Sequence, residues 1–354
     1  MMDYLRLVAE ADPIPGVEIK VITYDTQSNP GRIPVGYQWL KGQGAAAMSC
    51  SPIDFELVMD NAAADHIPFI GLSNVLSTLQ NDWQFSTMGP VDSEIEVLLQ
   101  WVMDGWQGYP TKPKIGFVGL AGVPFFQGQL NMAQTVCGQH PDKLEWLGAQ
   151  MAPTTTTSWA IEVSRLMSSD FIIVALSGPP LASFTREAIN RGYKNRFIGP
   201  YETYRGFWPL LAASVPLADL DGTVTAAYAP WYDENVPYIS EIKEYMQEHL
   251  SPGQIEATYL DFGRIHGWAH GMVLVDTVRR AVQKVGAANV DGSALRDALA
   301  ETNIDMAAVG WGNPWKITGK AHCFAQTIKV YEYKASSNSM TAVSSWIRPA
   351  SLED

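Results

Sequence analysis

The stretch that decides the fold runs from Ala45 to Asn74, AAAMSCSPIDFELVMDNAAADHIPFIGLSN. An apolar strand from Ala45 ends in small polar residues, a helical pattern follows over 53–65, and a second apolar strand over 67–70 ends in Gly, Ser and Asn. Strand, helix and strand in direct succession predict a parallel βαβ unit.

Small polar residues follow both strands of this unit. Because parallel strands deliver their carboxyl ends to one edge of a sheet, we expect Ser51 to lie near Ser73 and Asn74. Ser51 and Pro52 also suit the start of a helix, where Ser caps free amides and Pro is tolerated. Two interpretations of Ser51 follow: it only caps the helix, or it also helps to hold a small polar acceptor such as a carboxylate.

The alternation of strand and helix continues through most of the chain. Apolar runs at 114–120 and 170–177 predict buried parallel strands, and 92–103 has the pattern of an amphipathic helix. Further strands are expected at 17–24, 84–89, 144–151, 196–200 and 223–228, and a β-ribbon at 315–318 and 327–333.

This βα series occurs twice, before and after about residue 110. The expected fold is therefore α/β, with two Rossmann-like lobes that contain parallel sheets and are joined by a hinge. We expect residues 1–110 to form the N-terminal lobe, to which about 231–305 returns. Residues 111–230 form the C-terminal lobe, with about 306–354 as hinge and β-ribbon.

Composition excludes some classes of partner. The chain has 354 residues, long enough for two domains, with 24 basic and 37 acidic residues in no long run of either sign. Nucleic acid is therefore not an expected partner, because phosphate binding needs clustered Lys and Arg. No apolar stretch approaches the ~20 residues that span a bilayer, and the start has an amphipathic helical pattern with no signal-peptide character.

No motif predicts catalysis, a metal or a cofactor. Gly42 and Gly44 precede a strand, whereas a dinucleotide-binding loop follows one. His266 and His270 lie four apart but lack the catalytic Glu of a metalloprotease motif, and Ser177 is not in a nucleophile elbow. We expect a protein that is not an enzyme and has no cofactor.

Several motifs in order resemble those of the type I periplasmic solute-binding proteins of ABC transporters, the branched-chain amino-acid-binding group in particular. These motifs are Tyr24–Pro30, Cys50-Ser51, Ile67–Ile70, Arg196–Pro200 and the long helix after Asp261. Each is loose by itself, but their order and spacing cover essentially the whole chain. The resemblance implies a two-lobed "flytrap" that closes on a small ligand.

The resemblance also implies site residues. Ser51 matches the ligand-binding serine of the family, and Ser73 and Asn74 fall where the ligand carboxylate is held. Phe125 falls where an aromatic side chain of the second lobe covers the ligand, and Ser177 falls in another loop that lines the cleft.

The position after Gly199-Pro200 departs from the family pattern. Amino-acid binders of the family usually have an acidic residue there for the ligand ammonium, but this chain has Tyr201, with Glu202 next. Either Glu202 takes that role or the ligand has no ammonium group. Glu202 also fits a solvated loop charge.

The family's first strand and gating loop precede the position of Met1, so a gap in the first sheet is expected. Cys50 matches a cysteine that is disulfide-bonded in some relatives, but the partner position is Ser28, so a free thiol is expected. Trp231 and Tyr232 either line the cleft with their ring faces or pack beneath the hinge.

The expected function is that of an extracytoplasmic substrate-binding protein. Such a protein delivers a small polar metabolite, here an amino acid, an amide or an aromatic acid, to the permease of an ABC transporter. It is periplasmic or extracellular, with a lipid anchor on the full-length precursor as an option. The alternative is a cytoplasmic amide or amino-acid sensor or regulator on the same fold.

Overall fold

The computed structural model describes residues 1–27, 29–49, 55–258 and 262–353. The chain forms two compact units, which are described separately. Unit 1 contains residues 1–90 and 264–326, and unit 2 contains 91–263 and 327–353. Both consist of helices and mainly parallel strands, which confirms the expected α/β fold with two Rossmann-like lobes.

Unit 2 is built on a seven-stranded sheet with the order β11-β10-β7-β6-β5-β3-β4. Its strands are β3 (Lys114–Leu120), β4 (Glu145–Ala152), β5 (Phe171–Ala175), β6 (Arg196–Pro200), β7 (Val224–Ala227), β10 (Lys329–Lys334) and β11 (Ser339–Ala342). The first five are parallel, and β5 is fully buried, as expected of a central strand of β-branched residues.

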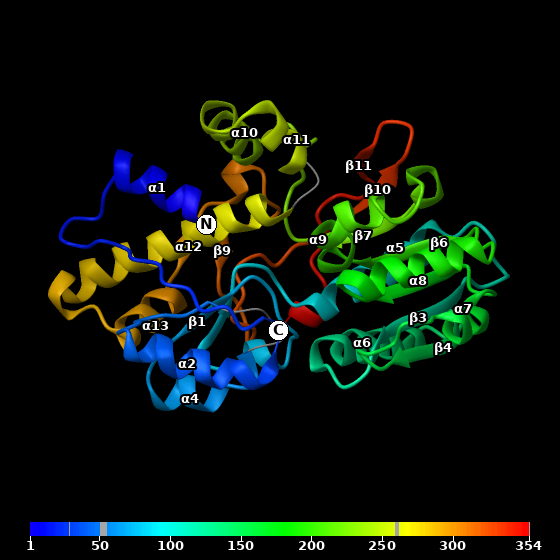
Figure 1. Cartoon of the computed structure of the whole chain (residues 1–354), viewed down its shortest axis with the longest axis horizontal. Coiled ribbons are helices and arrows are strands. Elements are labelled where there is room, and N and C mark those ends of the chain that lie inside the picture. Colours follow the sequence, from blue (N-terminus) through cyan, green and yellow to red (C-terminus); the bar gives the residue numbers. More distant parts are fainter. Residues whose placement is uncertain (28, 50–54, 259–261, 354) are drawn as a thin grey trace. The chain divides into compact units, whose positions relative to one another are not determined.

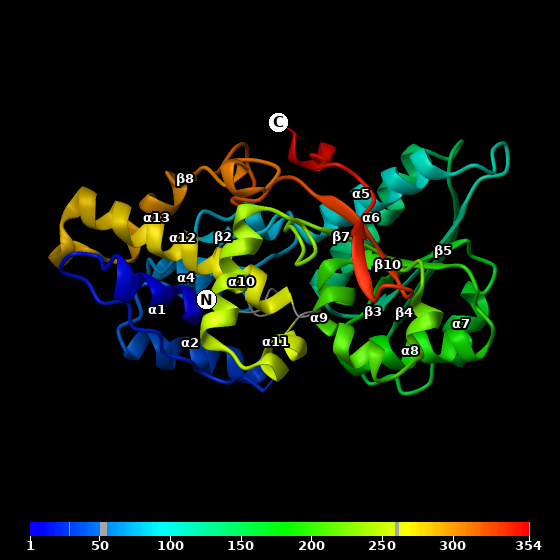
Figure 2. The same ribbon diagram turned by 90° about the horizontal axis from the view of Figure 1, so that it is seen from above.

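Helices cover both faces of this sheet. They are α5 (Val91–Gly105), α6 (Pro124–Gln139), α7 (Ala160–Leu166), α8 (Gly178–Asn190) and α9 (Tyr201–Ala212). Unit 2 also contains α10 (Pro237–His249) and α11 (Pro252–Thr258), which pack on each other. Figure 2 shows α5 and α6 on one side of the sheet and α7, α8 and α9 on the other. The sheet is therefore a buried middle layer, and its strand ends are where loops emerge.

The boundaries of the units differ from the expected ones near residues 110, 230 and 305. The structure places them after residues 90, 263 and 326. The first difference arises because α5 packs on α6, β6 and β7 of unit 2 and buries Val91, Ile95, Leu98 and Val102 there. A helical pattern predicts a buried face but does not identify the sheet that buries it.

The expected β-ribbon of residues 315–318 and 327–333 is wrong. β9 (Trp315–Lys316) pairs with β8 (Asn303–Ile304) in unit 1, whereas β10 pairs with β7 and β11 in unit 2. Nearness in sequence suggested that the two strands pair with each other, but each finds its partner elsewhere.

In unit 1 the strands are short and the helices form most of the core. β1 (Phe69–Gly71) and β2 (Gln84–Ser86) are parallel, and Met48 forms a single parallel bridge with Phe69. The helices are α1 (Met2–Ala11), α2 (Ile33–Gly42), α4 (Met59–Ala64), α12 (Phe262–Val285) and α13 (Gly292–Ala300). In Figure 1, α12 lies on one side of β1, and α2 and α4 lie on the other.

The strand expected at Val17–Tyr24 is not formed. Residues 17–24 have no strand assignment, although Val17, Ile19 and Val21 pack against buried residues of α1, α12 and α13. The alternating side chains were identified correctly, but a strand also needs a neighbouring strand to pair with. No such pairing exists for this segment in the described part of the chain.

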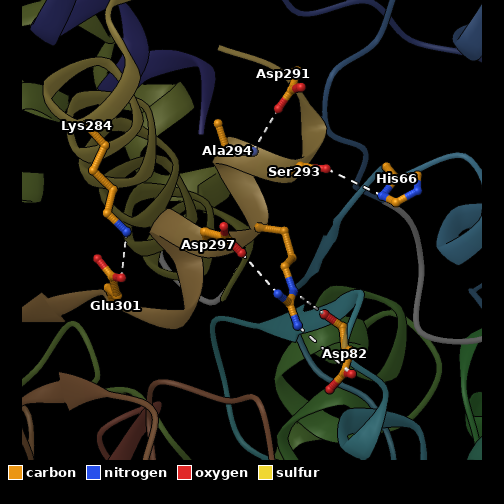
Figure 3. Close-up of polar contacts among 9 residues, drawn as sticks. His66, Asp82, Lys284, Asp291, Ser293, Ala294, Asp297 and Glu301 are labelled. Carbon is orange, nitrogen blue, oxygen red and sulfur yellow. Dashed lines mark hydrogen bonds and ion pairs between the residues drawn. The ribbon is translucent and has the colours of Figure 1, made fainter. Parts of the chain in front are cut away.

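Polar contacts hold α13 against the start of the β1 region (Figure 3). The Asp291 Oδ1 accepts a hydrogen bond from Ala294 N at 2.8 Å and so caps the helix. Ser293 Oγ and His66 Nδ1 are 3.4 Å apart, and Arg296 forms ion pairs with Asp82 and Asp297. A Cβ on Gly292 would lie only 1.9 Å from the carbonyl oxygen of His66, so the first turn needs glycine.

Candidate functional site

Four neighbouring parallel strands of unit 2 end at the same edge of its sheet. β3, β5, β6 and β7 are adjacent, and their last residues are in register, with Gly119 opposite Ala175 and Pro200 opposite Ala226. The residues expected to bind ligand from this unit are in or just after the segments that follow these strands, namely Phe125, Ser177, Tyr201, Glu202 and Trp231. We call these five residues the carboxyl edge of unit 2. Ligand-binding residues often lie in loops that follow the carboxyl ends of parallel strands.

Tyr201 is held at this edge by a carboxylate from a distant helix. Its backbone N–H donates to Oε2 of Glu94 at 2.9 Å, and both residues are almost fully buried. Tyr201 is the first residue of α9, and the preceding Pro200 has no side chain that can cap the helix. A negative charge at a helix N-terminus is favourable, so Glu94 takes over the capping role.

Glu202 lies in the first turn of α9. Both of its carboxylate oxygens are inaccessible to solvent. This burial does not fit a solvated loop charge, which was one of the two interpretations of Glu202. The first turn of α9 therefore has two carboxylates, Glu202 from the helix itself and Glu94 from α5, which bonds to Tyr201 N.

The loop after β7 is organised by Glu234. Its Oε1 accepts a hydrogen bond from Trp231 N at 2.8 Å and another from the Tyr331 hydroxyl, and its Oε2 pairs with Lys329. The rings of Trp231 and Tyr232 are 1 % exposed and meet edge to face, with centroids 5.3 Å apart. The loop is thus fixed to the neighbouring strand β10 through one carboxylate.

Phe125 and Ser177 complete the carboxyl edge. Phe125 is buried at the start of α6, and its ring meets Phe126 edge to face with centroids 5.5 Å apart. Ser177 precedes α8 in an extended conformation, and its side chain makes no capping hydrogen bond to that helix.

In unit 1, Ser73 and Asn74 follow β1 and are both 1 % exposed. The Ser73 hydroxyl donates to the carbonyl of Gly89, after β2, at 3.3 Å, and Asn74 Oδ1 accepts from Val75 N at 2.8 Å. The Ser73 contact joins the two loops that follow β1 and β2, and the Asn74 contact lies within the first of them. The structure therefore places both residues together at the carboxyl end of parallel strands in unit 1.

Ser51 and Cys50 lie outside the described residues, so their roles stay predictions. The nearby Ser49 is exposed and lines a cavity of about 180 Å³ in unit 1. The cavity is otherwise mostly apolar, with Ile33, Tyr37, Leu40, Met48, Val58 and Phe69 in its wall.

His270 of α12 is buried in unit 1 and lies within hydrogen-bond distance of a threonine. The Nδ1 atom of His270 lies 3.0 Å from the Thr87 hydroxyl. Burial, aided by the positive charge of the Met1 amino group, lowers the pKa of His270 to about 4. Within the described ranges no group of three or more His, Cys, Asp or Glu side chains could hold a metal ion.

The guanidinium of Arg264, at the start of α12, pairs with Asp3 inside unit 1. The residues missed by the sequence analysis are Glu94 and Glu234. Neither lies in a recognisable sequence motif. Each makes a contact with a segment far away along the chain, and a local motif does not contain such a contact. Only the position of Glu94 in the first turn of a helix hinted at a special environment.

Comparison with known proteins identifies the family. Residues 1–338 match the periplasmic binding protein family, and the chain belongs to this family. No curated protein sequence matches the chain. No helix in the described parts is long and apolar enough to cross a membrane. Membership of a binding-protein family agrees with the expectation that the chain is not an enzyme, and it implies a periplasmic or extracellular location.

Solved structures show the same fold at low sequence identity. A branched chain amino acid ABC transporter protein from Thermus thermophilus with bound valine has a TM-score of 0.80 at 16% identity, over 99% of this chain and 91% of that chain. A fatty acid ABC transporter substrate-binding protein from Thermomonospora curvata has a TM-score of 0.80 at 19% identity, over 100% and 87%. A solute-binding protein from R. palustris in complex with benzoate has a TM-score of 0.76 at 14% identity, over 98% and 91%.

Proposed function

We propose that this chain is the substrate-binding protein of an ABC importer and that its ligand is a small polar metabolite with a carboxylate or amide group. The observation that carries the proposal is the carboxyl edge of unit 2, where four adjacent parallel strands present aromatic, hydroxyl and carboxylate side chains. The ligands named for the similar structures, valine, benzoate and fatty acid, share a carboxylate.

The proposed roles follow the chemistry of the side chains. Ser51, Ser73 and Asn74 hold the carboxylate or amide end of the ligand. Phe125, Tyr201 and Trp231 enclose its remaining part, with Ser177 beside them, and Glu202 balances an ammonium group when the ligand has one. Contacts from both units stabilise a closed state of the protein, which is the form that an ABC transporter permease would receive. A lipid anchor on a longer precursor would keep the protein near that permease.

A thermal-unfolding screen tests this function. The purified chain is screened against amino acids, amides, urea and aromatic acids. A ligand at about 100 times its dissociation constant adds about 2.7 kcal/mol of stability, which appears as a raised melting temperature. A normal unfolding transition that no compound of the panel shifts would contradict the proposed ligand class.

Glu202→Gln then separates the two kinds of ligand. Loss of the shift is expected for an amino acid, because its ammonium loses the carboxylate, whereas an aromatic acid keeps its shift. The matched control is Glu187→Gln on α8, where the carboxylate pairs with Arg191 at the surface. An equal loss in both variants would show that Glu202 has no part in binding.

A further inference from the structure

The cavity of about 180 Å³ in unit 1 lies between α2 and β1. Its floor is made by buried apolar and aromatic side chains, which are those of Ile33, Tyr37, Met48, Val58 and Phe69. Its mouth is made by residues that are half-buried or exposed, namely Tyr24, Thr26, Leu40 and Ser49. The cavity therefore has an apolar floor and reaches the surface beside a threonine and a serine.

Hydrogen bonds fix the floor of the cavity. The Tyr37 hydroxyl donates to Oδ2 of Asp65 at 2.8 Å, so its ring is held in one position by a residue that does not line the cavity. The N–H of Met48 donates to Pro68 O at 3.0 Å, and its carbonyl accepts from Ile70 N at 2.9 Å. Side chains that are anchored in this way cannot move together to close the space, so the cavity persists.

The mouth has a fixed aromatic rim. The ring of Tyr24 lies directly on α2, because a Cβ on Gly36 would be only 2.5 Å from its Cδ1 atom. The guanidinium carbon of Arg32 is 5.5 Å from the centroid of the Tyr24 ring, and the ring of Trp39 is 5.8 Å from it. Contacts with these three residues of the α2 region hold Tyr24 beside the opening.

The chemistry of the wall selects the kind of molecule that fits. Among the described residues that line the cavity, none has a charged side chain, so a carboxylate or ammonium group would lose its hydration without compensation. The rings of Tyr37 and Phe69 are nearly parallel, at 13°, with centroids 6.2 Å apart, and they supply aromatic surface. An apolar cavity of about 150 Å³ takes up a molecule of the size of benzene.

We propose that this cavity is a second binding site of the protein, for a small uncharged aromatic or alicyclic molecule. Its ring would lie on the floor, and a polar substituent would face Thr26 and Ser49 at the mouth. Such a molecule restores van der Waals contacts that the wall lacks and so stabilises unit 1. Of the residues proposed to hold the carboxylate ligand, none that the structure describes lines this cavity, so the site goes beyond the proposed function.

Methyl NMR of the full chain tests the site, with toluene as the probe. The methyl groups of Leu40, Met48 and Val58 report on the cavity, and those of β5 in unit 2 serve as a reference. We expect toluene to shift the three cavity signals in a saturable manner. Benzoate has the same ring with a carboxylate, and it should act on these signals with at least about 10-fold lower affinity, because no charged side chain meets it there.

Filling the cavity should remove the site. Leu40→Trp places a large ring at the mouth and should weaken toluene binding at least about 10-fold. The matched control is Val35→Trp on the same helix, where the side chain is 59% exposed and does not line the cavity; it should bind toluene as the parent does. If Leu40→Trp does not fold, Val58→Thr is used instead, because it puts a hydroxyl into the floor at similar size and should also weaken binding.

Several results would overturn the proposal. Toluene that shifts no cavity methyl signal up to its solubility limit would do so, and so would unsaturable shifts spread over both units. Equal toluene affinity of Leu40→Trp and Val35→Trp would show that the molecule binds elsewhere, and equal affinity for benzoate at the cavity signals would contradict the uncharged class. Toluene has no carboxylate or amide group, so failure of this site and failure of the proposed function are separate outcomes.

Discussion

Glu94 Oε2 accepts a hydrogen bond at 2.9 Å from the backbone N–H of Tyr201, a residue 107 positions further along the chain. The contact connects the first turn of α5 to the first turn of α9 and thereby sets where Tyr201 and Glu202 stand at the carboxyl edge of unit 2. The contact positions residues of the candidate site, and no sequence motif predicts it.

Replacement of Glu94 should weaken unit 2. Glu94→Ala is expected to lower the free energy of unfolding by about 1.5–3 kcal/mol, because a buried helix N-terminus loses a charged acceptor. Glu94→Gln keeps an acceptor oxygen and should lose less. Urea unfolding of the three proteins measures this, and equal stability of Glu94→Ala and the parent would show that water replaces the carboxylate at no cost.

His270 should make the protein less stable in mild acid. Its pKa is about 4 in the folded chain, below its usual 6.5, because burial disfavours the charged ring. Above pH 6.5 both states are neutral and no effect arises. As the pH falls from 6.5 toward 4, only the unfolded chain takes up the proton, so up to about 3 kcal/mol of stability is lost.

Urea unfolding between pH 7 and 4 of the parent and of His270→Gln checks this expectation. Gln does not titrate and offers polar atoms to Thr87, so its curve should be flatter over that range. Parallel curves would mean that other groups cause the acid sensitivity.

Gly292→Ala should be strongly unfavourable. The added Cβ would lie 1.9 Å from the carbonyl oxygen of His66 and 3.1 Å from that of Ala46, so α13 must shift. We expect a loss of about 1–3 kcal/mol in thermal or urea unfolding. Gly42→Ala at the end of α2 is the control, because no heavy atom lies within 4 Å of its new Cβ. A similar effect of both substitutions would contradict this account.

The pair of Glu234 and Lys329 should show strong coupling. Their side chains are only 16% and 14% exposed, so Glu234→Ala leaves a poorly solvated ammonium and should lower stability by about 3–5 kcal/mol. Lys329→Met removes the ammonium, so the double variant should recover much of that loss. A double-mutant cycle in urea measures the coupling, and additive losses would show that the pair acts independently.

Local sequence patterns predicted many elements closely. The bounds of β3 and β6 agree with the expected 114–120 and 196–200, because short apolar runs that are buried on both faces have few alternative structures. The helix expected over 92–103 agrees with α5 within two residues at each end, whereas α9 and α11 were not predicted. Ser73 and Asn74 were correctly expected after a strand, since the order of strand and turn is a local property.

Pairing between distant segments was less predictable. β10 joins β7 instead of β9, and α5 belongs to unit 2 although its sequence follows unit 1 without a break. The carboxylates of Glu94 and Glu234 acquire their roles only through partners that are far away in the chain. Such contacts depend on how the strands are ordered in the sheet, and local hydrophobic periodicity does not predict that order.

The sequence by itself determined the α/β class, the repeated βα series and the strand ends on which the candidate site residues stand. Hydrophobic periodicity and turn chemistry act over a few residues, so they can be read from the chain directly. Only the tertiary structure decided which strands pair, which helix ends are capped by a distant side chain, and that residues 17–24 pair with no strand among the described residues. A strand exists only when a second segment supplies hydrogen bonds along its length, and that condition belongs to the folded unit.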